Sequence, residues 1–248
     1  MNDVMSMGLH RCWKRRLVSI LSPRPGMRML DVAGGTGSLQ NDDVLGDVTF
    51  KFLLEYRKRF PISSAESPRV TIVDINPAML EVGQKRATNM LPTDLQHLIE
   101  WRCADAEQLT QSTSKGPGVP AAAFDAYTIA FGIRNCTSIE KVLAQAHRTL
   151  VPGGLLAVLE FSPQLETNGT LGAIFQNVYD LYSTYGIPAL GTLIGGNREP
   201  YQYLIESIRK FPTNETFATM IEAAGFSHVH VETLAGGICA IHTAVKLQ

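Results

Sequence analysis

Short apolar runs alternate with segments of helical periodicity along most of the chain. Five of these runs have the length and the β-branched or buried character of strands. The five are Met27–Val32, Arg69–Ile75, Ile99–Cys103, Phe124–Phe131 and Leu155–Phe161. Two more strand-like runs, His228–Leu234 and Ile238–Lys246, flank Gly236-Gly237, a pair typical of a hairpin.

Helix signals lie between the runs. Asn76-Pro77 has the residue types preferred at a helix N-cap and first turn. The expected helices are Pro77–Met90, one from Thr137 or Ser138 to Leu150, and one from Thr213 or Asn214 to Gly225, with Pro152-Gly153-Gly154 turning the chain before the fifth strand. This alternation predicts an α/β fold: a doubly wound, mostly parallel seven-stranded sheet covered on both faces, with the terminal hairpin adding antiparallel edge strands.

The chain reads as a single domain, 1–248, with two additions. We expect residues 1–22 to form an amino-terminal lid segment and residues 164–210 a helical cap over the substrate. Segments 38–47, 61–68 and 111–123 have the composition of exposed loops.

Composition excludes several classes of protein. The 248 residues are 45% hydrophobic with a formal net charge of −1, which argues against a disordered chain and against a basic nucleic-acid-binding surface. The uncharged stretch 181–197 is interrupted by four glycines and a proline, so we expect no membrane-spanning helix and a soluble chain. The four cysteines form no CxxC pair, so we expect neither a disulfide framework nor a metal site.

The strongest chemical signal is the run Leu30-Asp31-Val32-Ala33-Gly34-Gly35-Thr36-Gly37, directly after the first strand. Glycines there let the backbone approach a ligand at the carboxyl end of the sheet. A nicotinamide fingerprint would need a third glycine where Gln40 stands, and the run instead fits the glycine loop of S-adenosylmethionine-dependent methyltransferases. Asp74 and the pair Asp105-Ala106 follow the next two strands, placed for a ribose and an adenine edge. The alternative is that the glycines only make a tight turn.

Motifs along nearly the whole chain strengthen this interpretation. They include LDVAGGTG, DINPAML, DAEQL, FGIRNCT, HRTLVPGG, LEFS, YDLYS, YQYLIESIRKFP, MIEAAGF and GICAIH. In this combination the chain resembles the ubiquinone/menaquinone biosynthesis C-methyltransferases. The resemblance implies a class I, Rossmann-like methyltransferase fold and S-adenosylmethionine as cofactor. It places the cofactor contacts on Gly35, Thr36, Gly37, Asp74, Asp105 and Ala106, and a contact at Ala130 would use only backbone.

The resemblance also implies an activity and a setting. The activity is C-methylation of a 2-methoxy-6-polyprenyl-1,4-benzoquinol ring in ubiquinone biosynthesis. Two alternatives stay open: a methyltransferase acting on demethylmenaquinol, and a catalytically impaired structural subunit of a quinone-biosynthesis complex. The implied setting is the matrix side of the mitochondrial inner membrane with other quinone-biosynthesis proteins as partners. A peripheral membrane contact and a homodimer are left open, and no nucleic acid is expected.

Two departures from the family pattern stand out. Ser38–Gly46 separates the glycine loop from Asp47, where the pattern runs directly into a helix. These nine residues either loop out or displace that helix. The chain also begins at Met1-Asn2-Asp3, whereas relatives carry an upstream segment, so we expect part of the lid and any transit peptide to be missing.

Arg134 and Asn135 are the catalytic candidates, since they follow the fourth strand on the face where the reacting group is expected. A quinol carbon becomes nucleophilic when a ring hydroxyl loses its proton, so a positive group near the phenolate accelerates methyl transfer. Arginine is a poor base, which favours an electrostatic role for Arg134, with Asn135 fixing a ring oxygen and water accepting the proton. The alternative is a structural arginine paired with a carboxylate.

Aromatic side chains in the cap are candidates for contact with a polyprenyl tail. Ordinary helix packing explains them equally well. The residues are Tyr179, Tyr182, Tyr201 and Tyr203. A lesser catalytic candidate, His10, lies in the lid segment, beside basic residues that fit either a lipid contact or a solvated face.

Overall fold

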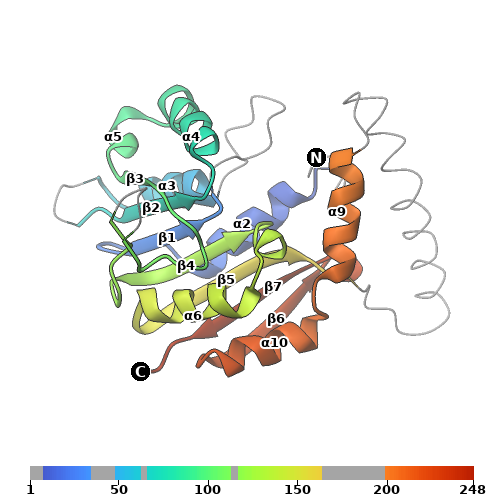
Figure 1. Ribbon diagram of the computed structural model, residues 1–248. Helices are drawn as coiled ribbons and strands as arrows, with labels where there is room; N and C mark the ends of the chain where they lie inside the picture. Colours follow the sequence, from blue (N-terminus) through green and yellow to red (C-terminus); the bar gives the residue numbers. More distant parts are fainter. Residues whose placement is uncertain (1–7, 35–47, 63–65, 113–116, 164–198) are drawn as a thin grey trace.

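A computed structural model describes residues 8–34, 48–62, 66–112, 117–163 and 199–248 (Figure 1). Its centre is a seven-stranded sheet in the order β3-β2-β1-β4-β5-β7-β6. The strands are β1 Arg28–Val32, β2 Arg69–Asp74, β3 Ile99–Cys103, β4 Phe124–Ala130, β5 Leu150–Phe161, β6 Ser227–Leu234 and β7 Cys239–Val245. Strands β1 to β5 pair in parallel, and β7 is antiparallel to both β5 and β6. The predicted doubly wound α/β architecture is confirmed.

The start of β5 differs from the prediction. Leu150 already pairs with Phe124, and the regular ladder resumes where Ala126 meets Leu155. The expected turn at Pro152-Gly153-Gly154 is therefore an irregularity inside one strand. Gly153 adopts φ +79°, a conformation that a glycine reaches at little cost.

The carboxyl-terminal hairpin corrects a second expectation. Its two strands are joined by the short turn η3 (Ala235–Gly237), in which Gly236 and Gly237 have φ values of +69° and +93°. The prediction that both strands lie at the edge is wrong, because β7 inserts between β5 and β6 and only β6 is at the edge. Strand β5 is apolar enough to be paired on both sides, and β7 supplies its second partner.

The helices cover both faces of the sheet. They are α2 His10–Leu21, α3 Val48–Arg59, α4 Pro77–Met90, α5 Thr93–Gln96, α6 Ile139–Thr149, α9 Glu199–Lys210 and α10 Asn214–Ala223, with the single turn η1 at Ile133–Asn135. Three predicted caps are present, since the side chains of Asn76, Ser138 and Thr213 accept backbone N–H groups at 3.0, 3.3 and 3.2 Å.

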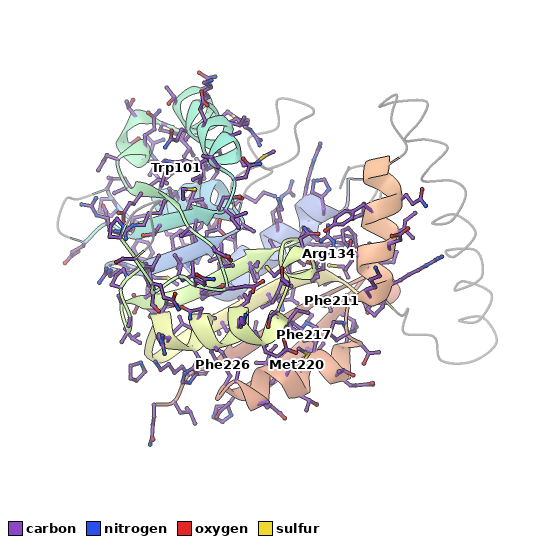
Figure 2. All side chains as sticks on the ribbon, in the orientation of Figure 1. Trp101, Arg134, Phe211, Phe217, Met220 and Phe226 are labelled. Atoms are coloured by element: carbon purple, nitrogen blue, oxygen red, sulfur yellow. The ribbon has the colours of Figure 1, made fainter. Side chains whose placement is uncertain are left out.

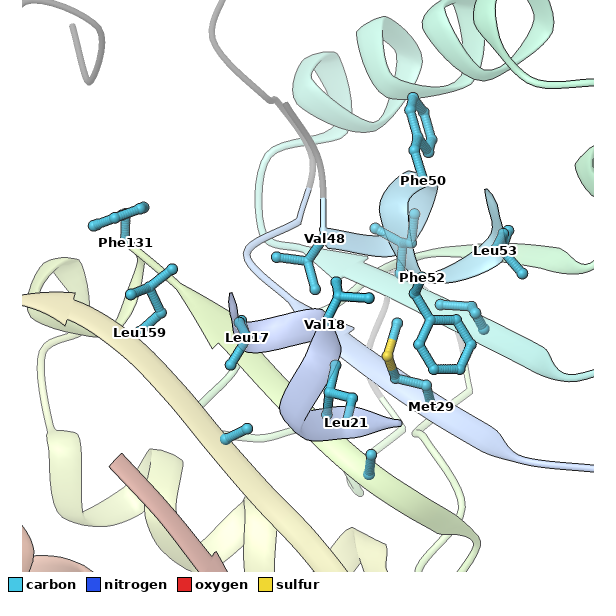
Figure 3. Close-up of a cluster of buried hydrophobic side chains, with 14 of the residues drawn as sticks. Leu17, Val18, Leu21, Met29, Val48, Phe50, Phe52, Leu53, Phe131 and Leu159 are labelled. Carbon is cyan, nitrogen blue, oxygen red and sulfur yellow. The ribbon is translucent and has the colours of Figure 1, made fainter. Parts of the chain in front are cut away.

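Two hydrophobic clusters lie on opposite faces of the sheet. One is built by α2, α3 and α9 against residues such as Met29 and Leu159 (Figure 3). The other joins α6 and α10 to the far face, where Phe217 is fully buried beside Phe211 (Figure 2). These layers hold the sheet rigid beneath the ends of its strands, where the chemistry is expected.

The two predicted additions are partly visible. Helix α2, inside the lid segment, buries Trp13 and Leu17 against the sheet, and α9 lies beyond the carboxyl ends of β4 and β5 (Figure 1). Residues 164–198 of the predicted cap lie outside the described residues, so the domain boundaries stay predictions. In the portion of the chain described, no helix combines the length and apolarity needed to span a bilayer.

Candidate active site

The site is organised around the boundary between β1 and β4. The chain leaves β1 toward β2 on one side and leaves β4 toward β5 on the other, so the connections diverge and a crevice opens at the carboxyl ends. A cavity of about 340 Å³ lies at this point, and its walls come from the ends of β1, β2, β3 and β4. A volume of this size falls within the roughly 300–1,000 Å³ of small-molecule sites. We refer to it as the donor cavity.

Three of the predicted cofactor residues, Asp74, Asp105 and Ala106, line the donor cavity together. Oδ1 of Asp74 accepts the N–H of Asn76 at 2.9 Å, and Oδ1 of Asp105 accepts the N–H of Glu107 at 2.9 Å. Each carboxylate therefore fixes the turn that follows its own strand. The other three predicted residues, Gly35, Thr36 and Gly37, lie outside the described residues.

The ends of β1 and β4 approach each other very closely in the wall of the donor cavity. A Cβ atom added to Gly132 would lie 2.6 Å from Cβ of Ala33, closer than two carbon atoms can pack. Ala33 and Phe131 both have positive φ values, +55° and +58°, which non-glycine residues rarely adopt. Backbone strain of this kind is concentrated at functional sites.

Asp31, in the glycine-loop motif, is buried beneath this wall. Its carboxylate accepts the hydroxyl of Thr49 at 2.6 Å and the hydroxyl of Thr128 at 2.7 Å. Thr49 is in the first turn of α3, so this contact fastens the helix that follows Ser38–Gly46 to β1 and β4. Helix α3 is therefore docked against the sheet. Of the two outcomes considered for the nine residues Ser38–Gly46, displacement of this helix from the sheet is not observed.

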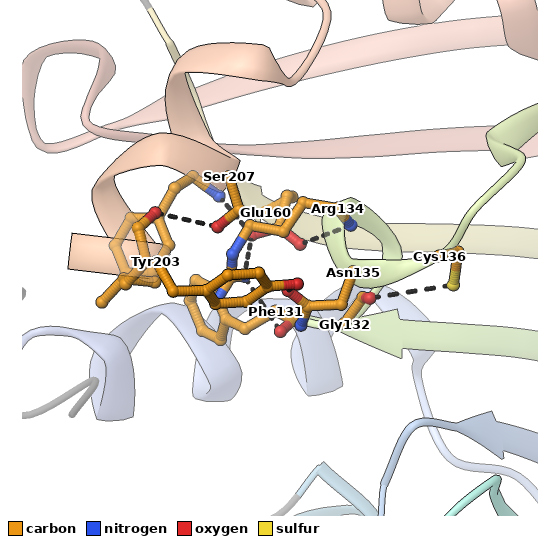
Figure 4. Close-up of polar contacts among 10 residues, drawn as sticks. Phe131, Gly132, Arg134, Asn135, Cys136, Glu160, Tyr203 and Ser207 are labelled. Carbon is orange, nitrogen blue, oxygen red and sulfur yellow. Dashed lines mark hydrogen bonds and ion pairs between the residues drawn. The ribbon is translucent and has the colours of Figure 1, made fainter. Parts of the chain in front are cut away.

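A second cavity, of about 540 Å³, lies beside the first between η1, α6, α9 and α10. We call it the acceptor cavity. The two cavities share the wall formed by Asn135, Cys136 and Thr137. The predicted residues Arg134, Asn135 and Tyr203 line the acceptor cavity, and the phenol of Tyr203 donates to Oδ1 of Asn135 at 3.4 Å (Figure 4).

Arg134 is buried, with 4% of its side chain exposed, and forms an ion pair with Glu160, which is 1% exposed. The same guanidinium donates to the carbonyl of Phe131 at 2.9 Å and lies over the ring of Phe161 at 5.5 Å. The carboxylate pairing that the sequence left open as an alternative is thus present. Arg134 also borders the acceptor cavity, and its catalytic role stays a prediction.

Cys136, in the shared wall, has an unreactive thiol. Burial, with smaller effects from Glu107, Asp105 and Glu160, raises the pKa of its thiol to about 12. The thiol is therefore protonated at neutral pH and donates weakly to the carbonyl of Gly132 at 3.8 Å. The shared wall presents an amide and neutral groups to both cavities and no nucleophile from this cysteine.

Sequence reasoning gave no site role to Glu107, Phe131 and Gly132, which are among the residues that line the donor cavity. The carboxylate of Glu107 accepts the N–H groups of Thr137 and Ser138 at 2.6 and 2.9 Å, which joins the loop after β3 to the start of α6. All three lie in the motifs DAEQL and FGIRNCT, which the sequence analysis identified without assigning these residues to the cofactor site.

The remaining candidates divide by position. His10 is buried on α2, and Tyr201 lies on α9. Tyr179 and Tyr182 lie outside the described residues. Of the four tyrosines proposed for the tail, only Tyr203 has a described side chain, and it is 57% exposed.

Known proteins resemble this chain in sequence and in fold. The model of the ubiE/COQ5 methyltransferase family matches residues 1–246. The 2-methoxy-6-polyprenyl-1,4-benzoquinol methylase, mitochondrial, of Drosophila melanogaster is 47% identical over 250 residues, covering 100% of this chain and 75% of the relative. The ubiquinone/menaquinone biosynthesis C-methyltransferase UbiE of Methylobacterium nodulans is 46% identical over 250 residues, covering 100% and 85%.

A solved S-adenosylmethionine-dependent methyltransferase from Aquifex aeolicus superposes with a TM-score of 0.56 at 14% identity, covering 94% of this chain and 89% of that one. At this identity the likeness shows a shared fold.

Proposed function

The chain belongs to the ubiE/COQ5 methyltransferase family, and from that premise we propose that it methylates a ring carbon of a 2-methoxy-6-polyprenyl-1,4-benzoquinol. It is an S-adenosylmethionine-dependent methyltransferase of ubiquinone biosynthesis. The names of the fly and Methylobacterium relatives support a quinol ring as the acceptor.

One observation carries the proposal: the donor and acceptor cavities share the wall Asn135, Cys136 and Thr137. Methyl transfer is an in-line displacement, so donor and acceptor must meet without intervening water. Two neighbouring cavities at the carboxyl ends of β1 and β4 provide such a meeting point.

The donor cavity fits S-adenosylmethionine, which supplies an electrophilic methyl group on a sulfonium when bound. Asp74, Asp105 and Ala106 line this cavity, and we propose that Asp74 accepts the ribose hydroxyls and that Asp105 and Ala106 contact the adenine edge. Gly132 carries no side chain, which leaves backbone at the cavity wall. Gly35, Thr36 and Gly37 are proposed to hold the methionine end.

On the acceptor side, the ring carbon attacks the methyl carbon, the new C–C bond replaces the C–S bond, and the ring then loses its proton to water. Asn135 is proposed to fix a ring oxygen, and the positive charge of Arg134 to stabilise the phenolate that makes the carbon nucleophilic. Tyr203, with Tyr179, Tyr182 and Tyr201, is proposed to line the path of the polyprenyl tail.

We propose the matrix side of the mitochondrial inner membrane as the setting, with other quinone-biosynthesis proteins as partners in a complex. The relatives from Drosophila melanogaster and Arabidopsis thaliana are named mitochondrial, which supports the compartment. The homodimer and the peripheral membrane contact are part of the same proposal and rest on family resemblance.

The test begins with calorimetric titration of S-adenosylmethionine into the folded protein. We expect saturable binding with one site per chain. A folded protein that showed no binding heat would favour a structural subunit of a quinone-biosynthesis complex.

The second step offers methyl-labelled cofactor with short-tailed analogues of the demethylated benzoquinol and of demethylmenaquinol. Transfer to the benzoquinol is expected to exceed transfer to the naphthoquinol in kcat/KM. The opposite order would assign the enzyme to demethylmenaquinol instead.

A further inference from the structure

The carboxylate of Glu160, which lies at the end of β5, is buried against Arg134, a residue that lines the acceptor cavity. One of its oxygens, Oε1, accepts both the guanidinium of Arg134 and the N–H of Phe161, the latter at 2.9 Å. The other, Oε2, accepts the backbone N–H of Arg134 at 3.5 Å. A single carboxylate therefore binds both the backbone and the side chain of Arg134 (Figure 4).

The contacts continue from Arg134 into the strained end of β4. The guanidinium donates to the carbonyl of Phe131, whose φ of +58° is outside the ordinary range for a phenylalanine. Phe131 lines the donor cavity, and Asn135 lies in the wall that the two cavities share. The pair thus joins the end of β5 to the turn η1 at the point where donor and acceptor meet.

The surroundings of the pair are aromatic. The ring of Phe161 lies under the guanidinium. Its centroid is 4.7 Å from the ring centroid of Phe131 and 6.2 Å from that of Trp13 on α2. Water is excluded on this side, so the charges attract strongly, but neither can be left alone without a large desolvation cost. A buried ion pair is a weak source of net stability. Arg134 lines the acceptor cavity and contacts Phe131 of the donor cavity, which points to a role in the reaction.

One atom of the guanidinium supports this view. Nε of Arg134 is buried and has no hydrogen-bond partner among the described residues. Buried donors are almost always paired in native proteins, and those that are not call for an explanation. The Glu160 carboxylate holds Nη1 of the same group, so the orientation of Arg134 is fixed while its Nε–H donor stays unpaired among the described residues.

We propose that Glu160 is a positioning residue for methyl transfer: by gripping Arg134 it fixes the turn Phe131–Asn135 between the donor and acceptor cavities. The proposal rests on the proposed function for its kinetic readout. Glu160 itself touches neither substrate nor cofactor and acts through Arg134.

A double-mutant cycle tests this, with Glu160→Gln, Arg134→Met and the double variant measured together. If Glu160 acts through Arg134, Glu160→Gln lowers kcat at least 30-fold in the native background and less than 3-fold in the Arg134→Met background. The Kd for S-adenosylmethionine stays within a factor of 2 throughout. Losses that multiply, or a Glu160→Gln enzyme keeping more than half of its kcat, would overturn the proposal.

Glu81→Gln is the matched control. It is the same substitution in the exposed pair with Lys85, at 2.8 Å, and should change neither kcat nor the cofactor Kd. If Glu160→Gln does not fold, Glu160→Asp keeps the charge while withdrawing it by one methylene, and the same cycle is run with that variant. The same thresholds then decide the proposal.

Hydrogen–deuterium exchange of the peptide covering residues 131–136 gives a readout that needs no quinol. Glu160→Gln should speed its exchange at least 10-fold while peptides of β1 and α10 stay unchanged, and Glu81→Gln should have no effect. If Glu160→Gln instead speeds exchange equally in all peptides of the chain, Glu160 is only structural. If the native enzyme is inactive on quinols but Glu160→Gln still speeds exchange locally, the proposed substrate is wrong and the positioning role of Glu160 stands.

Discussion

Oδ2 of Asp31 on β1 accepts a 2.6 Å hydrogen bond from the hydroxyl of Thr49 on α3, and both side chains are buried. The bond joins the strand that enters the glycine loop to the helix that leaves it. Because Asp31 also accepts the hydroxyl of Thr128, one carboxylate holds β1, β4 and α3 together beneath the donor cavity.

Replacing Thr49 with valine should destabilise the protein by about 1–3 kcal/mol. Valine has nearly the same shape as threonine, but the buried carboxylate of Asp31 loses the hydroxyl that donates to it. Urea unfolding at neutral pH measures the change. Thr49→Ser keeps the hydroxyl and should lose less. Equal stability of the valine and serine variants would show that the contact contributes nothing.

Deleting residues 38–46 should leave S-adenosylmethionine binding within about 3-fold of the native Kd, because the bond from Thr49 to Asp31, which fastens α3 to the sheet, is kept in the deletion variant. Calorimetric titration of the deletion variant checks this. A deletion variant that folds, as judged by its circular dichroism, but loses the cofactor would show that these residues belong to the site.

Gly132→Ala should cost about 1–3 kcal/mol of stability and weaken cofactor binding, because its new methyl group would overlap Cβ of Ala33. The compensating variant Ala33→Gly/Gly132→Ala removes the opposing methyl and should recover both properties, as measured by thermal unfolding and cofactor titration. If Ala33→Gly restores neither stability nor cofactor binding to Gly132→Ala, the new methyl group does not clash with Ala33.

Asp74→Asn should raise the Kd for S-adenosylmethionine about 10- to 100-fold, since hydrogen bonds to a charged carboxylate contribute roughly 1.5–3 kcal/mol. The amide oxygen of asparagine still accepts the N–H of Asn76, so the melting temperature should stay within a few degrees. Unchanged affinity would remove Asp74 from the cofactor contacts.

His242 makes the fold sensitive to acid. Burial lowers the pKa of its imidazole to about 4, against a smaller opposing effect of the hydrogen bond that Nε2 donates to the carbonyl of Asn214. Nδ1 has no partner in the described part of the chain. The unfolded chain takes up a proton near pH 6.5, so the stability from the neutral ring is complete above that pH and declines as pH falls toward 4.

Between pH 8 and pH 5 this group should cost about 2 kcal/mol of stability. His242→Gln, which keeps an N–H donor but does not titrate, should lose correspondingly less over the same interval. Urea midpoints of the two proteins at pH 8 and pH 5 measure the difference. Parallel losses would assign the acid sensitivity to other groups.

Local signals in the sequence predicted most of the elements. Asn76 and Ser138 cap α4 and α6 as expected, because a cap depends on residues within one helical turn of each other. Asp74 and Asp105 reach one cavity because each directly follows a parallel strand, and such strands end at the same edge of a sheet.

The contacts that define the site were beyond such reasoning. Glu160 pairs with Arg134 across 26 residues, and Thr49 meets Asp31 across 18. Both pairings depend on strand order and helix docking, which no local pattern encodes. The position of β7 was missed for the same reason, because a hairpin can add to a sheet by either of its strands.

That position has a consequence for synthesis of the protein. Strand β5 pairs with β7 along Leu155–Phe161, but β7 follows β6 in the chain. While Cys239–Val245 is still inside the ribosome tunnel, the apolar flank of β5 stays open in the nascent chain. Until β7 pairs with it, this flank is an unpaired apolar strand edge of the kind that promotes aggregation.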